Sequence, residues 1–317
     1  MNPYTHISVE AIEELGPTGV DLCLSCHGYE SRSTAHLTLD SLASADRRVS
    51  FGFDFPQVEA DSDVAARISD ARKRLTAAGF STPIADDRAF ERTVKEELQS
   101  LEKRRRCRLA VDISSMSRSR IAAALVACCT EEWPKGCDLD IVYFPGSYAS
   151  HKHPYEPLEY FGPAHRHISG WPDDPDLPLA LLIGLGTEPG RADGVVELLE
   201  PDILATFIPI GPEEQYIEEV RKENRRVLEV GGQPVMYDLQ DPIAIYGSLL
   251  ASATRLAGRA RLVVLPLGPK VFFAISVIAA LKVGPQVGVW KASAGRGVQP
   301  VDVKSERSPI LVRLRIG

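Results

Sequence analysis

Four short turns in this sequence combine glycine or serine with a basic residue, a combination suited to holding a phosphate group. Glycine lets the backbone approach a ligand closely, serine hydroxyls donate hydrogen bonds, and arginine forms forked hydrogen bonds to phosphate oxygens. The turns span 28–33, 112–118, 186–191 and 266–270. The ligand-binding residues that we predict from them are Gly28, Tyr29, Ser31, Arg32, Ser114, Ser115, Arg118, Gly186, Glu188, Arg191, Gly268 and Lys270.

Two acidic residues, Glu30 and Asp112, lie within the first two turns and are the candidate catalytic residues. Either carboxylate could orient a ribose hydroxyl, hold a divalent metal ion or act as a general base. A simpler interpretation is also open. Ser31 and Ser114 could cap helices, and Arg32 and Arg118 could be solvated or could pair with Glu30 and Asp112.

The elements around these turns alternate between strand and helix, which predicts parallel sheets covered on both faces. In the first half we expect strands at 20–26, 48–53, 108–113 and 139–144, with helices at 31–43, 63–78, 88–105 and 119–132. In the second half we expect strands at 179–185, 203–210, 234–238, 261–265 and 287–290, with helices at 192–199, 213–230, 242–256 and 271–283. The fold class is therefore α/β, with two tandem Rossmann-like domains at 1–148 and 178–317 and a Pro/His-rich connection at 149–177.

The spacing of the turns favours an internal duplication. Glu30 and Glu188 are 158 residues apart, and Arg118 and Lys270 are 152 residues apart. In an open parallel sheet, ligands bind beyond the carboxyl ends of the strands, where the strand order reverses. We expect the two turns of each half to face one another across such a crevice. The first half, which has Asp112 and more serine and arginine, is the better candidate for chemistry.

Composition narrows the classes of function. The net charge of −7 argues against bulk electrostatic binding of nucleic acid, and no apolar run is long enough for a membrane span. The N-terminal residues do not resemble a signal peptide, and several of the six cysteines lie in apolar runs, which suits buried free thiols in a reducing compartment. We therefore predict a cytoplasmic protein, with a homodimer as one option. Cys23 and Cys26 form a C-x-x-C inside a predicted strand, where their side chains point to opposite faces.

Several standard motifs are missing. The sequence contains no P-loop, nucleophile elbow or His-Glu-x-x-His, and the glycine-rich stretch at 184–190 departs from the dinucleotide-binding fingerprint. Two His-x-His pairs, His151/His153 and His165/His167, could hold a metal, but Lys152 and Arg166 beside them disfavour a cation. We predict exposed histidines and assign no metal ligand.

The stretch from Asp112 to Arg118 resembles the Asp–aliphatic–Ser/Thr turn of the CRISPR-associated Rossmann-fold (CARF) domains, and Gly28–Ser33 stands where their first-strand loop would be. A tandem pair of such units is similar to the SAVED sensors of antiphage signalling. The resemblance implies a cyclic-oligonucleotide ligand held by Ser31, Arg32, Ser114, Ser115 and Arg118. It also implies a stand-alone sensor, a ring-degrading enzyme, or a subunit that works with a separate effector protein.

Residues 109–115 also resemble the ribose-phosphate loop of type I phosphoribosyltransferases, although a second acid and the glycine-rich tail are missing. Three functions thus remain open. The leading one is a nucleotide-binding sensor or regulatory subunit of a prokaryotic defence or signalling system. The others are an enzyme that cleaves a nucleotide, and a scaffold subunit whose pockets are vestigial.

Overall fold

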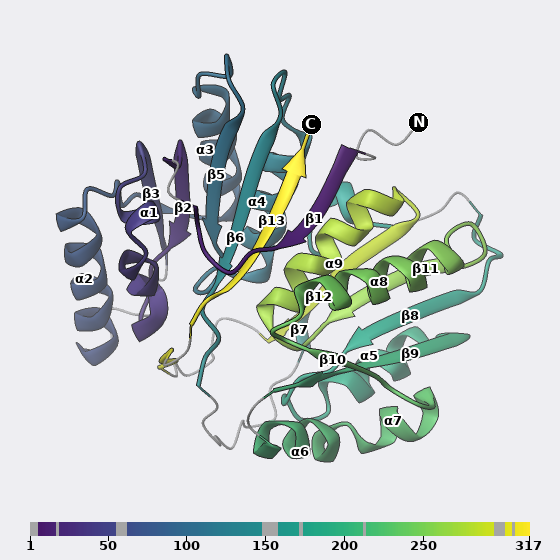
Figure 1. The fold of residues 1–317 in the computed structure, drawn as a ribbon. Helices are drawn as coiled ribbons and strands as arrows, with labels where there is room; N and C mark the ends of the chain where they lie inside the picture. Colours follow the sequence, from purple (N-terminus) through teal and green to yellow (C-terminus); the bar gives the residue numbers. More distant parts are fainter. Residues whose placement is uncertain are drawn as a thin grey trace. The chain divides into compact units, whose positions relative to one another are not determined.

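A computed structural model of the chain describes residues 6–16, 19–54, 62–147, 158–170, 174–211, 214–294, 302–305 and 308–317. The chain divides into two compact units. The first unit comprises His6–Ser147 together with Gln299–Gly317, and the second comprises Tyr148–Val298. Each contains one parallel-dominated sheet, so the predicted α/β fold with two Rossmann-like halves is confirmed (Figure 1).

The first unit is built on a seven-stranded sheet in the order β1-β13-β6-β5-β2-β3-β4. Its strands are β1 (Ile7–Ala11), β2 (Leu22–Cys26), β3 (Arg47–Phe53), β4 (Ile84–Ala85), β5 (Cys107–Asp112), β6 (Cys137–Tyr143) and β13 (Ile310–Ile316). Strands β2 to β6 are mutually parallel, β13 pairs antiparallel with β6, and β1 pairs antiparallel with β13. Strand order reverses between β2 and β5, whose residues are buried throughout, as expected of central strands covered on both faces.

The helical segments of the first unit are η2 (Ser31–Thr38), α1 (Asp40–Ala43), α2 (Ser62–Ala77), α3 (Asp87–Gln99) and α4 (Arg118–Thr130). Helix α2 packs on η2, and α3 packs on α4. The helix expected at 31–43 is instead a 3₁₀ helix followed by one short α-helix, because Leu39 between them has extended backbone angles. The helix expected at 88–105 is shorter than predicted and ends at Gln99.

The second unit contains a six-stranded sheet in the order β10-β9-β8-β11-β12-β7. Its strands are β7 (Leu158–Pro163), β8 (Leu179–Gly184), β9 (Ile203–Ile210), β10 (Val235–Asp238), β11 (Arg261–Pro266) and β12 (Val287–Ala294). All are parallel except β7, which pairs antiparallel with β12. The parallel strands have the same order as in the first unit, with the reversal between β8 and β11.

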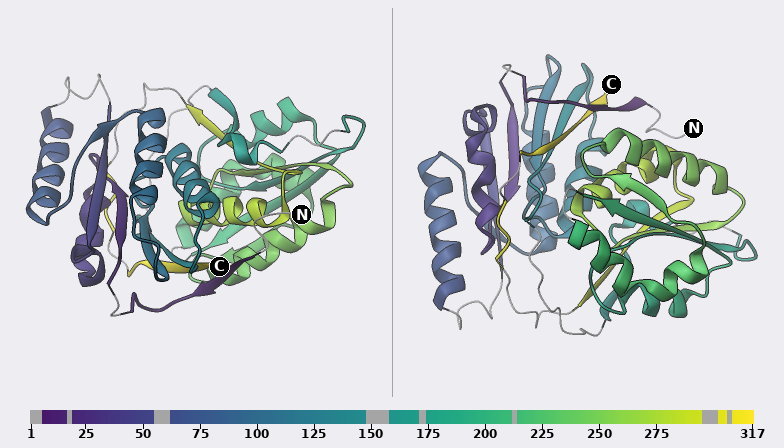
Figure 2. Two further views of the ribbon diagram at one scale, coloured as in Figure 1. Left: turned by 90° about the horizontal axis from the view of Figure 1, so that it is seen from above. Right: turned by 60° about the horizontal axis from the view of Figure 1, so that its bottom comes forward.

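The helices of the second unit are α5 (Arg191–Leu199), α6 (Glu214–Glu223), α7 (Arg225–Gly231), α8 (Pro242–Leu256) and α9 (Lys270–Val283). Helices α8 and α9 lie on one side of the sheet and α5, α6 and α7 on the other (Figures 1 and 2). The prediction of one helix at 213–230 is wrong, because the segment forms two helices that are separated at Asn224. The side-chain amide of Asn224 donates to the carbonyl oxygens of Val220 and Gly186, at 2.6 and 2.8 Å, where the first helix ends.

The division into units differs from the sequence prediction at the C-terminal end. Strand β13 pairs along its whole length with β6 of the first unit, so the second unit does not extend over 178–317. In Figure 1 the yellow β13 lies between β6 and β1. Strand β7 falls in the stretch predicted to be an irregular connection. The last parallel strand of each unit, β6 or β12, therefore has an antiparallel neighbour. The neighbour of β6 is β13, which follows β12 in the sequence, and the neighbour of β12 is β7, which follows β6.

Candidate functional site

The two turns of the first unit meet at the point where strand order reverses. Strand β2 ends at Cys26 and β5 ends at Asp112, and the two strands pair directly. Beyond their ends, the Ser115 hydroxyl donates to Glu30 Oε2 at 3.2 Å. The two turns of this half therefore meet at the predicted end of the sheet.

Arg32 is directed inward rather than toward solvent. Its Nε and Nη2 donate to the two Glu30 carboxylate oxygens at 2.9 and 3.4 Å, and Nη1 donates to the Phe144 carbonyl oxygen at 3.2 Å. Burial by itself would lower the pKa of Arg32, but the adjacent Glu30 carboxylate outweighs burial and raises that pKa. The guanidinium therefore stays charged and is held by its own chain, which agrees with the simpler interpretation of this residue.

Asp112 is almost completely buried, with 1% of its surface exposed. Its Oδ1 accepts hydrogen bonds from the Ser114 backbone N–H, at 2.9 Å, and from the Ser114 hydroxyl. Its Oδ2 lies 2.8 Å from Nδ1 of His36, which is also buried. Ser114 Oγ in turn accepts from the Phe144 N–H at 2.9 Å. Asp112 and Ser114 therefore fix the shape of the turn, and this closed geometry gives a bound substrate no direct access to Asp112.

Arg118 is partly buried at the first residue of α4, a helix that Ser117 caps by accepting from the Arg120 N–H at 3.2 Å. Arg120, which sequence reasoning missed, is 1% exposed. Its guanidinium lies 3.9 Å from the Phe53 ring centroid and donates to the carbonyl oxygens of Gly52, at 3.2 Å, and Ala85. Arg120 thus ties α4 to the ends of β3 and β4. The Ser-Arg-Ser-Arg run at 117–120 was a signal that could have pointed to it.

His27 follows β2 and is a second buried residue that the sequence analysis did not single out. Its side chain is 1% exposed, and Nδ1 lies 3.2 Å from the Ser50 hydroxyl oxygen. Burial, assisted by the charges of Arg72 and Arg120, lowers the pKa of His27 to about 4. The imidazole is therefore neutral at pH 7, so it adds no positive charge to the crevice.

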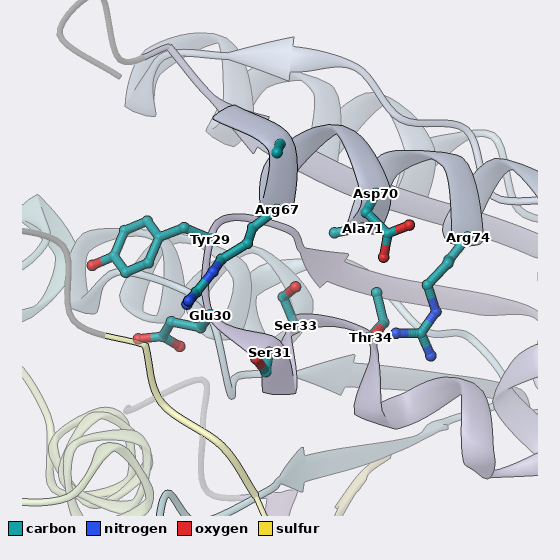
Figure 3. Close-up of a pocket in the computed structure, with 10 residues that line it drawn as sticks. Tyr29, Glu30, Ser31, Ser33, Thr34, Arg67, Asp70, Ala71 and Arg74 are labelled. Atoms are coloured by element: carbon teal, nitrogen blue, oxygen red, sulfur yellow. The ribbon is translucent and has the colours of Figure 1, made fainter. Parts of the chain in front are cut away.

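A cavity of about 340 Å³ opens between the first turn and α2. It is lined by Tyr29, Glu30, Ser31, Ser33, Thr34, Ala66, Arg67, Asp70, Ala71 and Arg74. Figure 3 shows Arg67 and Arg74 reaching from α2 toward the segment that carries the serines. Arg67, Asp70 and Arg74 recur at intervals of three and four residues, which places them on one face of the helix. This spacing is visible in the sequence, but the sequence analysis predicts no ligand-binding residue in α2.

A carboxylate from a distant part of the chain is bound at the edge of this cavity. Asp302 Oδ1 accepts the Ser31 backbone N–H and Oδ2 accepts the Ser31 hydroxyl, both at 2.7 Å. Arg67 Nη1 lies 3.0 Å from the same Oδ2. Partial burial opposes ionisation of Asp302, but the two hydrogen bonds from Ser31 and the charge of Arg67 together lower its pKa. These three groups therefore constitute an oxyanion-binding position.

The equivalent crevice in the second unit is closed by backbone packing. The Leu267 and Gly268 N–H groups donate to the Gly184 carbonyl oxygen at 2.8 and 3.1 Å. A Cβ atom at Gly268 would lie 2.6 Å from the Leu185 carbonyl oxygen, and one at Gly186 would lie 2.8 Å from that of Leu267. The glycines thus permit the two turns to touch each other, which leaves little room for a ligand between them.

The charged residues predicted for the second unit lie around these turns. Arg191 is the first residue of α5, and its N–H donates to the Glu188 carbonyl oxygen at 3.4 Å. The Glu188 carboxylate lies against Gly186, where an added Cβ would be 2.5 Å from Oε2. Lys270 is the first residue of α9. The structure places all three at the predicted end of the sheet, around a closed crevice.

The described residues contain no group of three or more His, Cys, Asp or Glu side chains that could hold a metal ion. His165 and His167 stack with ring centroids 5.1 Å apart, whereas His151 and His153 lie outside the described residues. All six cysteines are free and buried, and burial raises the pKa of Cys23. Within the described parts of the chain, no helix is both long and apolar enough to cross a membrane.

Comparisons with known proteins do not assign this chain to a family. No family model matches it, and no curated protein matches it. The crystal structure of the cytoplasmic domain of a prokaryotic cation chloride cotransporter aligns with 89% of this chain and 98% of its own, at 8% identity and a TM-score of 0.24. A score this low identifies neither a shared fold nor a shared function.

Proposed function

We propose that the first unit binds a phosphate-bearing nucleotide in the cavity between the first turn and α2, and that the chain acts as a nucleotide sensor or regulatory subunit. The observation that carries the proposal is the oxyanion-binding position formed by the Ser31 N–H, the Ser31 hydroxyl and Arg67. These groups hold a carboxylate through the kinds of contact that a phosphate oxygen accepts.

The rest of the cavity supports the same ligand class. Arg74 supplies a second cation on the face of α2 that carries Arg67, and Tyr29 supplies an aromatic ring at the cavity wall. The volume of about 340 Å³ is within the range of small-molecule sites. One wall of the cavity is the turn that follows β2, at the carboxyl ends of the parallel strands, the end of an open α/β sheet at which ligands bind.

Binding is favoured over catalysis because of what surrounds the two candidate carboxylates. Asp112 is buried and contacts Ser114 and His36, while Glu30 accepts from Arg32 and Ser115. A cleavage reaction would need one of them to leave these partners. The resemblance to CARF domains extends the proposal to a cyclic oligonucleotide as ligand and to a cytoplasmic sensor of a prokaryotic defence system.

Thermal unfolding of the purified protein tests the proposal. The panel consists of AMP, ATP, cyclic AMP, cyclic di-AMP, cyclic tri-AMP and cyclic tetra-AMP. A ligand at a hundredfold excess over its Kd stabilises by about 2.7 kcal/mol, which for a unit of this size raises the Tm by roughly 5–10 °C. Arg67→Ala and Arg74→Ala should remove most of that shift. Arg92→Ala on α3, where the side chain is 73% exposed, should leave it unchanged.

Two results would contradict the proposal. One is a panel in which no nucleotide raises the Tm of the wild-type protein. The other is a shift that survives in the Arg67→Ala, Arg74→Ala double variant, because the ligand would then bind elsewhere. Mass analysis of the recovered nucleotide distinguishes binding from turnover. A cleaved product would favour the enzyme alternative, with Glu30 as the carboxylate that lines the cavity.

A further inference from the structure

The carboxylate at the oxyanion-binding position belongs to a short segment, 302–305, that the backbone also holds in place. The Arg32 N–H donates to the Val303 carbonyl oxygen at 3.2 Å, and the Ser147 N–H donates to the Lys304 carbonyl oxygen at 2.8 Å. Asp302 therefore reaches Ser31 from a segment hydrogen-bonded to the start of η2 and to the residues after β6. We call residues 302–305 the strap.

The strap and a ligand phosphate would compete for the same donors. Ser31 has one backbone N–H and one hydroxyl hydrogen, and Asp302 accepts both. Arg67 makes its contact with the same carboxylate oxygen that accepts the hydroxyl. A phosphate oxygen cannot occupy this position while the carboxylate is there, and the two anions would also repel each other at close range.

The contacts are of a kind that a ligand can replace. Side-chain exposure is 18% for Asp302 and 50% for Arg67, so their ion pair is partly solvated and makes a modest contribution to stability. The strap has no described regular secondary structure. Its hydrogen bonds to Ser31, Arg32 and Ser147 are not part of the strand pairings, so its release would leave the described strand pairings of the sheet intact.

We propose that Asp302 is an internal gate, an autoinhibitory contact that holds the oxyanion-binding position until a ligand phosphate displaces it together with the strap. This inference rests on the proposed nucleotide-binding function of the same cavity. The strap lies in the chain between β12 of the second unit and β13 of the first.

The first test compares the affinity of Asp302→Asn and wild-type protein for ATP and for inorganic phosphate, measured by calorimetry. Removing the competing charge should tighten binding by about fivefold or more, the lower end of typical coupling between two binding events. The control is Glu96→Gln on α3, which removes one negative charge from a side chain that is 63% exposed and remote from the cavity. Its affinity should equal that of the wild type.

The second test separates displacement of the strap from simple repulsion between charges. Hydrogen exchange is followed at the Arg32 and Ser147 amides, whose N–H groups donate to the strap. Saturating ATP should speed their exchange in the full-length wild-type protein. Unchanged or slower exchange at both amides would overturn the gate, because the strap would then remain bound beside the ligand.

The outcomes distinguish the gate from the proposed function on which it rests. Equal affinities of wild type and Asp302→Asn would refute the gate and leave nucleotide binding standing. Failure of both proteins to bind either ATP or phosphate, with native circular dichroism spectra, would refute the gate for these anions. The nucleotide panel then decides the proposed function independently, since a Tm shift by another nucleotide that requires Arg67 and Arg74 would preserve it.

Discussion

The buried cluster of Arg108, Asp140 and Arg313 offers the sharpest stability prediction. Asp140 on β6 has 0% side-chain exposure and accepts four hydrogen bonds. Two come from Arg108 on β5, at 3.2 and 3.1 Å, and two come from Arg313 on β13, at 2.6 and 2.9 Å. The side chains of Arg108 and Arg313 are only 8% and 17% exposed. The Asp140 carboxylate therefore neutralises two largely buried guanidinium groups, one from each of the strands that flank β6.

Asp140→Asn keeps the shape of this side chain and removes its charge. Two arginines then remain in a poorly solvated site without a counter-charge, a change that costs about 3–5 kcal/mol when a buried ion pair loses one partner. The first unit contains about 160 residues. At that size each kcal/mol lowers the Tm by roughly 2–4 °C, so we expect the first unit to melt roughly 6–20 °C earlier.

Asp138→Asn is the matched control, two residues earlier on the same face of the same strand. Asp138 is 24% exposed and pairs with Arg106, which is 42% exposed. Such a surface pair contributes about 0–1 kcal/mol. Urea unfolding and calorimetry of the two variants measure the difference. The reasoning is refuted if Asp140→Asn costs no more than Asp138→Asn, or if the joint replacement Arg108→Met, Asp140→Leu, Arg313→Met recovers none of the loss.

Two further predictions concern packing and protonation. Gly268→Ala should destabilise the second unit by about 1–3 kcal/mol, since its Cβ would meet the Leu185 carbonyl oxygen at 2.6 Å. Gly194→Ala in α5, where a Cβ meets nothing within 4 Å, should stabilise it by about 0.5–1 kcal/mol, and equal effects in calorimetry would contradict this account. The pKa of His27 is about 4 in the folded state, below its ordinary value of 6.5, so between these two pH values the unfolded chain binds a proton that the folded chain does not. The contribution of neutral His27 to the free energy of unfolding is therefore complete above pH 6.5 and is lost as the pH falls toward 4. That loss amounts to about 3 kcal/mol, and His27→Asn should flatten the stability–pH curve over this window in urea titrations. An unchanged curve would show that His27 is not its source.

The central strands could be predicted from sequence because their signal is local. β2, β5, β8 and β11 are short apolar runs followed by glycine- or serine-containing turns, and alternation with helices then fixes their parallel arrangement. The meeting of the turns beyond β2 and β5 follows from that topology. The meeting of the first unit's two turns could therefore be predicted from the chain alone, whereas the cavity between the first turn and α2 was not predicted.

The residues that complete the site were less accessible, since contacts between distant segments bring them together. Asp302 binds Ser31, which lies 271 residues away in the sequence, and no sequence pattern around either residue predicts this contact. Arg67 and Arg74 could have been found, because a seven-residue interval marks one helix face and α2 follows the strand beside β2. The burial of Arg32 and Asp112 depends on Glu30, Ser114 and Phe144 together, so it could not be read from any single motif.

Strands β7 and β13 have equivalent places in the two sheets. In each unit the fifth parallel strand is flanked by an antiparallel strand, and in each case that strand follows the fifth strand of the other unit in sequence. The strands of the second sheet all lie within residues 158–294, whereas the first sheet takes β13 from the C-terminal end of the chain. The hydrogen bonds from Arg313 to Asp140 fasten β13 to β6, whereas Asp302 in the strap is bound by Ser31 and Arg67 at the cavity. If a ligand displaces the strap as proposed, β13 should therefore stay paired with β6, because its own pairing and its ion pair with Asp140 do not involve the strap.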